Sequence, residues 1–186
     1  MSAHDPALAA VPPLPPGPAR EALVTALNTL DAAERQPHPV VMSLALAKVG
    51  HCCSDAGALA QAEWYLQRAL RWAMTLGSAD GAIDLVCELA ELAVRRAGEA
   101  AGTDATQVHA LRGQARDRCF EAAGMASRAA DPHWEVHVLL RVSEVLDRCG
   151  DHDDAISLQC RALHLLVSDE IPVLDTEAPG TSQSLM

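Results

Sequence analysis

The sequence has few aromatic residues and no long apolar run. Phe, Trp and Tyr make up 3% of its 186 residues, while hydrophobic residues together reach 49%. The apolar content is therefore mostly small and aliphatic, with much alanine, and such residues favour helices. No run approaches the roughly 20 apolar residues that cross a bilayer as a helix. We expect a helical protein without a membrane span.

Basic residues are also scarce, at 14 Lys and Arg against 25 Asp and Glu, which gives a net charge of −11. This charge repels phosphate backbones and anionic lipid surfaces, so we expect neither nucleic acid nor a membrane as a partner. The N-terminal MSAHDPALAAVPPLPPGP contains no Lys or Arg, and prolines interrupt its apolar residues. It lacks the pattern of a secretion signal, and we expect a cytoplasmic protein.

Motifs of the common catalytic sites are missing. The sequence contains no G-x-S-x-G, no G-x-x-x-x-G-K-[ST] and no G-x-G-x-x-G. Its six cysteines form no C-x-x-C pair, so we expect reduced thiols that pack as small hydrophobic residues. Cys52 and Cys53 are adjacent, but neighbouring helical side chains diverge by about 100°, and we expect one of them to be buried. We predict no enzyme and no cofactor.

Prolines and glycines divide the chain into helical segments. Residues 1–17 are rich in proline and residues 169–186 are polar and acidic, so we expect disordered ends around a folded region, 18–168. No segment alternates as a strand does, and short loops favour antiparallel neighbours. The fold class is therefore all-α, antiparallel helical hairpins of about seven helices. They are predicted over residues 18–36, 40–55, 58–76, 78 or 80 to 100, 103 or 104 to 130, 132–149 (after Asp131 as N-cap) and 151–167.

An internal repeat links two of these hairpins. The segment GHCCSDAGALAQAEWYLQRAL, from residue 50, aligns without a gap to SEVLDRCGDHDDAISLQCRAL, from residue 143. The spacing is 93 residues, and Gly57 coincides with Gly150 at the predicted turn. Ala62 coincides with Ala155 on the second helix, where a small side chain lets paired helices approach closely. The two hairpins therefore share one internal register.

This pattern resembles the tetratricopeptide repeat (TPR) family. In the first copy the family's positions fall on Leu46, Val49, Gly50, Cys53, Gly57, Ala62, Leu66 and Ala69. In the second copy they fall on Leu139, Val142, Ser143, Leu146, Gly150, Ala155, Gln159 and Ala162. Gln159 stands where the family usually has a large apolar residue. The resemblance implies a short right-handed solenoid of stacked hairpins.

The middle of the chain fits the family less well, because 93 is not a multiple of its roughly 34 residues. About 59 residues separate the two copies. We expect the two helices in this region to form one stretched hairpin, with AGEAAGTDA as its extended turn.

Proteins of this family mostly hold a peptide or helix of another protein in a groove lined by the first helix of each hairpin. The resemblance therefore implies an adaptor, a scaffold or a protein like a secretion chaperone. The family's clamp for a C-terminal carboxylate needs lysine and asparagine where this chain has Ala47 and His51, so we do not expect chaperone-tail binding. The groove positions are Lys48, His51, Asp55, Glu88, Glu91, Arg95, His137, Arg141, Glu144 and Arg148.

Trp64 lies almost opposite the apolar face of its predicted helix, close to Arg68 and Arg71. An exposed tryptophan beside arginine is typical of an interface anchor. The alternative is that Trp64 packs under the N-terminal helix.

Two clusters raise the alternative of a metal-binding or small-ligand protein. His133 and His137 lie four residues apart on one helix face, but Glu135 lies on another, so the H-E-x-x-H arrangement fails. Asp151 to Asp154 fall at a predicted helix start, where carboxylates stabilise the positive helix end without any metal. We predict no metal for either. A further alternative is a structural subunit of a larger assembly or of a homodimer.

Overall fold

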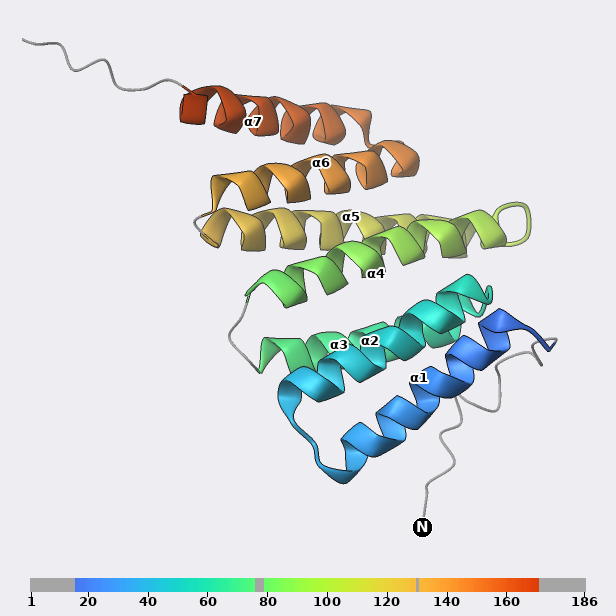
Figure 1. Ribbon diagram of the computed structural model, residues 1–186. Helices are drawn as coiled ribbons and strands as arrows, with labels where there is room; N and C mark the ends of the chain where they lie inside the picture. Colours follow the sequence, from blue (N-terminus) through green and yellow to red (C-terminus); the bar gives the residue numbers. More distant parts are fainter. Residues whose placement is uncertain (1–15, 76–78, 130, 171–186) are drawn as a thin grey trace, which may run out of the picture.

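A computed structural model describes residues 16–75, 79–129 and 131–170, and this part of the chain contains helices and no strand (Figure 1). The helices stack one after another along the chain, from α1 at one end to α7 at the other. This confirms the all-α class and the antiparallel hairpins. The seven helices are α1 (Pro18–Arg35), α2 (Pro39–Asp55), α3 (Leu59–Met74), α4 (Ala79–Ala100), α5 (Ala105–Arg128), α6 (Pro132–Cys149) and α7 (His152–Glu170).

The closest packing lies within three hairpins, α2 with α3, α4 with α5 and α6 with α7, while α1 packs on α2. The stretched hairpin predicted for the middle of the chain is confirmed as α4 and α5. Gly102 makes its turn with a φ of 89°, a left-handed conformation that glycine adopts without a Cβ clash. Asp104 then caps α5 by accepting a hydrogen bond from the backbone N–H of Gln107.

The turns of the two repeat copies are also as predicted. Gly57 and Gly150 both have positive φ, 75° and 91°, as their aligned positions require. Asp131 caps α6 by accepting from the N–H of Trp134, and Pro132 occupies the first helical turn.

The spacing of 93 residues also relates the two helices that precede these hairpins. Pro39 and Pro132 both begin a helix, and Arg35 and Arg128 both end one. Helices α1 to α3 therefore recur as α5 to α7. Helix α4 has no counterpart and connects the two sets.

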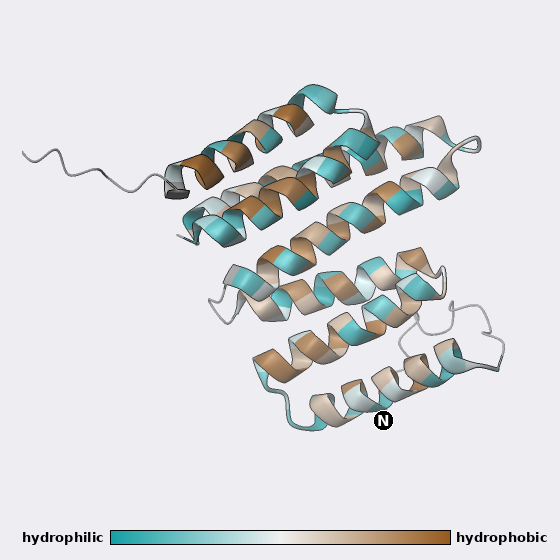
Figure 2. Cartoon of the chain, turned by 45° about the horizontal axis from the view of Figure 1, so that its top comes forward, coloured by the Kyte–Doolittle hydropathy of each residue, from teal (hydrophilic) through white to brown (hydrophobic). Residues whose placement is uncertain are grey.

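Helix α4 is buried on two faces. Leu85, Leu89 and Leu92 belong to a hydrophobic cluster built with α1, α2 and α3. Val86 and Ala90 belong to a second cluster, built with α5, α6 and α7. Brown apolar residues accordingly run along the insides of the stacked helices in Figure 2.

A carboxylate bridges the two halves beside these clusters. Glu63 of α3, whose side chain is 14% exposed, accepts a hydrogen bond from Arg96 of α4. Its other oxygen accepts from Arg118 of α5 at 3.1 Å, and Arg118 also donates to the Leu89 carbonyl at 2.8 Å. Burial lowers the pKa of Arg118, because its guanidinium is poorly hydrated at this position.

The departure at Gln159 has a structural explanation. In the first copy a Cβ at Gly50 would lie only 2.8 Å from the Leu66 side chain, so glycine fits this position best. In the second copy Ser143 takes the glycine position and Gln159 takes the leucine position. The Gln159 amide donates to the Ser143 hydroxyl at 3.4 Å, so a polar pair replaces an apolar contact.

The C-terminal boundary needs a small correction. Helix α7 continues to Glu170, past the predicted end at 167 and the domain boundary at 168. The Ser168 hydroxyl donates to the His164 carbonyl one turn earlier, so a polar residue is accommodated in the helix. Residues 1–15 and 171–186, which include most of the predicted disordered ends, lie outside the described residues.

Gly50→Ala should destabilise the protein by about 1–3 kcal/mol, because the added methyl overlaps Leu66 in a closely packed hairpin. Gly113→Ala is the matched control, since Gly113 lies inside α5 with no atom within 4 Å of a Cβ. It should stabilise the helix by about 0.5–1 kcal/mol. Urea unfolding of the three proteins checks this. Equal free energies of unfolding for both variants would contradict close packing at Gly50.

Glu63→Gln should cost about 2–4 kcal/mol, because it leaves two poorly hydrated guanidinium groups without their carboxylate. Glu34→Gln is the control, since Glu34 pairs with Arg68 at 3.8 Å and its side chain is 50% exposed. That change should cost less than about 1 kcal/mol. Urea unfolding measures the free energy of unfolding of both variants. If Glu63→Gln lost no more stability than Glu34→Gln, the bridge would be contradicted.

Candidate functional site

Six of the ten predicted groove residues gather around one hollow between α2, α4 and α6. Its volume is about 250 Å³. The first helices of the three hairpins supply its walls, as the repeat pattern predicts. The lining residues are His51, Ser54, Asp55, Leu66, Glu88, Glu91, Leu92, Arg95 and Arg141. We call this hollow the α2–α4–α6 pocket.

Three lining residues were not predicted. Leu66 and Leu92 are buried and form an apolar floor under the charged rim. Ser54 lies in the last turn of α2, where its hydroxyl and carbonyl both accept from Arg95. The predicted groove residues were all charged or titratable, so Ser54 and the two leucines were not among them. Ser54 could have been included because it directly precedes Asp55 at the same helix end.

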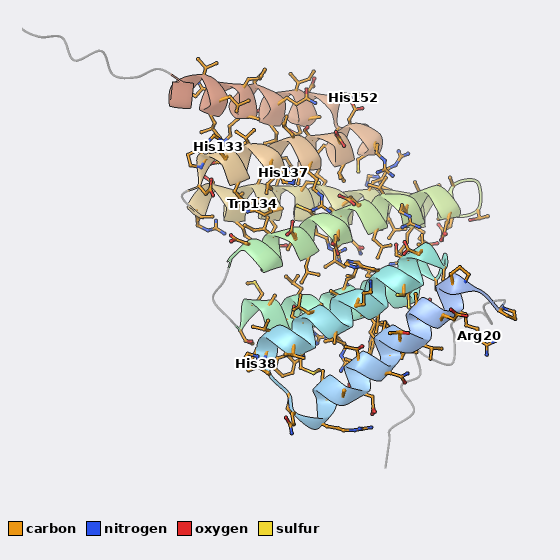
Figure 3. All side chains as sticks on the ribbon, in the orientation of Figure 1. Arg20, His38, His133, Trp134, His137 and His152 are labelled. Carbon is orange, nitrogen blue, oxygen red and sulfur yellow. The ribbon has the colours of Figure 1, made fainter. Side chains whose placement is uncertain are left out.

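The other four predicted residues do not line this pocket. Lys48 is exposed on α2, and His137, Glu144 and Arg148 are exposed on α6. His137 stacks on Trp134, with the ring centroids 5.4 Å apart. Figure 3 shows both side chains projecting from the first half of α6.

Arg141 connects α6 to α4 through carboxylates of α4. The Arg141 Nε donates to Glu91 at 2.7 Å, and an Arg141 Nη lies 3.4 Å from Asp84. Burial alone would lower the pKa of Arg141, but the bond to Glu91 and the charges of neighbouring groups raise it. Asp84, in contrast, is desolvated enough that its pKa is raised in spite of Arg141.

Further contacts connect α4 to α2. The His51 Nε2 and a Glu88 oxygen lie 2.7 Å apart. Arg95 binds Ser54 through its hydroxyl at 2.5 Å and its carbonyl at 3.0 Å. These side chains therefore hold one another across α2, α4 and α6 and define the shape of the pocket.

The prediction of Trp64 as an exposed anchor is wrong. Its side chain is half-buried and packs against the cluster that α1, α2 and α3 share. Its ring meets Tyr65 edge-on at 4.8 Å, and the Arg68 guanidinium lies 4.5 Å above it. Arg68 also lies 3.8 Å from Glu34 of α1, so the N-terminal helix approaches this corner and leaves Trp64 only partly exposed.

The two clusters considered for metal lie apart from each other. His133 and His137 lie near the start of α6, whereas His152 lies at the opposite end of the hairpin (Figure 3). Near His152, Asp154 pairs with Arg116 at 2.6 Å, beside a hollow of about 390 Å³. Within residues 16–75, 79–129 and 131–170, no three His, Cys, Asp or Glu side chains are grouped as a metal site requires.

The buried cysteines are held as thiols. Both Cys52 and Cys53 are buried, one more than predicted, and burial raises the pKa of Cys53 to about 11. Burial raises the pKa of Cys87 to about 12, and that of Cys119 further still. Such groups carry little thiolate at neutral pH, which suits packing rather than nucleophilic chemistry.

The His51 pair predicts a pH dependence of stability. The hydrogen bond to Glu88 raises the pKa of His51 above its ordinary value of 6.5, against the opposing effect of burial. A raised folded-state pKa means that this contribution is complete below about pH 6.5 and is lost as the pH rises through the folded value.

His51→Gln should therefore reduce stability more at pH 5.5 than at pH 8.5, by less than about 1 kcal/mol because the pair is partly exposed. Urea unfolding at both pH values measures the difference. His164→Gln, an exposed change on α7, is the control. An equal loss at the two pH values for His51→Gln would show that the pair does not contribute.

No helix of the described chain has the length and apolar content to cross a membrane. Comparison with models of protein families finds no match, and neither does a search of curated proteins. A search of solved structures finds similar chains. The DHF58 filament has a TM-score of 0.45 at 23% identity, over 81% of this chain and 80% of that one.

The crystal structure of the de novo designed helical repeat protein DHR64 also has a TM-score of 0.45, at 22% identity over 81% of this chain and 80% of that one. BtubC (BKLC) from P. vanneervenii has a TM-score of 0.37 at 16% identity, over 90% of this chain and 80% of that one.

Proposed function

We propose that this protein is a non-catalytic interaction module that binds a peptide or helix of one partner protein along α2, α4 and α6. It would act as an adaptor, a scaffold or a protein like a secretion chaperone. The observation that carries this proposal is the gathering of six groove residues, from three helices, around the α2–α4–α6 pocket. These are positions that the TPR resemblance assigns to the groove.

The groove offers both apolar and charged contacts to such a segment. Val40, Val41 and Leu44 are 41%, 46% and 66% exposed at the start of α2. Leu140 is 42% exposed on α6, beside Arg141. Aliphatic anchors beside a charged pocket suit an amphipathic segment, whose apolar side chains supply affinity and whose polar ones supply register.

The side chains of the pocket favour a binding role over a catalytic one. Glu88 and Glu91 of the pocket pair across helices with His51 and Arg141, and the buried thiols have raised pKa values. The histidine and the hydroxyl of the pocket are each bound to another group, since His51 Nε2 pairs with Glu88 and the Ser54 hydroxyl accepts from Arg95. A preformed, mutually braced surface instead lowers the cost of ordering side chains on binding.

A displayed library of random peptides, selected on the folded chain, tests the proposal. We expect a saturable binder whose affinity falls at least about 10-fold in Arg95→Ala, since that change removes an exposed cation from the pocket. Fluorescence anisotropy with the labelled peptide measures the affinity.

Arg112→Ala is the matched control, because Arg112 is an exposed arginine on α5, a second helix of its hairpin. It should leave the affinity unchanged, and circular dichroism should show both variants folded. Failure to select any saturable binder would contradict the proposal. Equal losses in the two variants would contradict the assignment of the groove.

A further inference from the structure

The outer face of α7 carries a row of exposed aliphatic side chains. Ile156, Leu163, Leu166 and Val167 are 56%, 60%, 40% and 57% exposed. Cys160 lies in the same row and is the exposed one of six free cysteines. Helix α7 packs on α6 and forms the end of the stack (Figure 1). We call this row the α7 stripe.

The spacing of the α7 stripe is that of a helix–helix seam. Ile156, Cys160, Leu163 and Val167 follow one another at intervals of four, three and four residues. This is the heptad spacing that keeps one narrow face of a helix against a second helix. The apolar residues of α7 that face α6, in contrast, include Ala155, Leu158 and Ala162, which are buried.

The internal repeat shows what the same face does elsewhere in the chain. At a spacing of 93, Ile156 corresponds to Glu63 and Leu163 to Leu70 of α3. Leu70 packs against both hydrophobic clusters, and Glu63 binds α4 and α5. On α3, neighbouring helices thus cover this face at Glu63 and Leu70, while Met74, which corresponds to Val167, is 58% exposed. On α7, Ile156 and Leu163 are exposed at the positions that are covered on α3. A solenoid end normally needs a polar outer face for solubility.

Charge favours a second copy as the partner of this face. The chain has a net charge of −11, which keeps copies apart at most of its surface. The sequence AISLQCRALHLLVS, from Ala155 to Ser168, contains no Asp or Glu. Its one arginine, Arg161, is bound to Glu135 and Ser127 of the same chain. The α7 stripe is therefore a face on which two copies meet without opposing carboxylates.

We propose that the protein forms a two-fold symmetric dimer in which the α7 stripes of two copies pack against each other. Each copy then contributes the same α7 stripe to the interface, as an isologous interface requires. Cys160 and Leu163 lie at the middle of the stripe, so they lie closest to the symmetry axis. The groove on α2, α4 and α6 stays open in such a dimer, which would carry two binding sites.

Sedimentation equilibrium of the full chain tests this proposal in a buffer with reductant. We expect a concentration-dependent mass that reaches twice the 19.7 kDa of one chain. Added salt should strengthen the dimer, since it screens the repulsion between two acidic chains. Leu163→Glu should weaken the dimer at least about 100-fold, because the symmetry places two buried carboxylates in one seam.

Leu44→Glu is the matched control, because Leu44 is the same residue type, is 66% exposed and lies on α2. It should leave the dimer intact. A mass of one chain at every concentration overturns the proposal, whatever else then covers the stripe. A dimer that Leu44→Glu breaks and Leu163→Glu does not also overturns it, because the interface would then lie elsewhere.

A short bismaleimide reagent gives a second measurement that does not depend on a destabilised variant. It should link two copies through Cys160 and give a covalent dimer on a denaturing gel. Cys160→Ser should lose the product while its sedimentation still shows the dimer. A linked dimer that persists in Leu163→Glu at the same yield would show that linking comes from collision, and would contradict the seam.

Discussion

Helix α4 must bury two apolar faces at once, and the arrangement of the other helices depends on that requirement. One face supplies Leu85, Leu89 and Leu92 to the cluster shared with α1, α2 and α3. The other supplies Val86 and Ala90 to the cluster shared with α5, α6 and α7. Since burial of such side chains is the main favourable term in folding, neither half of the stack is complete without α4. The Glu63 bridge to Arg96 and Arg118 lies at this junction and restricts how the halves meet.

The same constraint explains why the candidate site is charged. With two faces buried, α4 has one narrow strip left for solvent, and Asp84, Glu88, Glu91 and Arg95 lie on it. Neighbouring α2 and α6 bring His51 and Arg141 to this strip, where they pair with Glu88 and Glu91. The pocket is thus a consequence of how α4 is enclosed. Its pairs are partly exposed, so they define shape and specificity more than stability.

Sequence patterns predicted the helices well, because capping residues, prolines and glycines act locally. Asp104, Asp131, Gly57 and Gly150 all have the roles that their types favour. Groove positions were also predictable in part, since a repeat register fixes which face of a helix each residue occupies. Six of the predicted residues line the pocket, but Ser54, Leu66 and Leu92 were missed. Four others are exposed outside it: Lys48, His137, Glu144 and Arg148.

What the sequence could not predict depends on contacts between distant segments. The sequence left open whether Trp64 is exposed or packs under the N-terminal helix, because the contact between Arg68 and Glu34 of α1 joins distant segments. Glu63 resembled an ordinary surface charge, although residues 33 and 55 positions away bind it. In the second copy, Ser143 and Gln159 replace Gly50 and Leu66. The two replacements are explained together, because in each copy the two residues contact each other.

The central claim is that α2, α4 and α6 form the binding face of a braced helical stack. Backbone amide shifts of the labelled protein, recorded by NMR during titration with a selected peptide, test it most directly. The account predicts that shift changes cluster on α2, α4 and α6 around Ser54, Glu91 and Arg141. Changes confined to α3, α5 and α7 would contradict it.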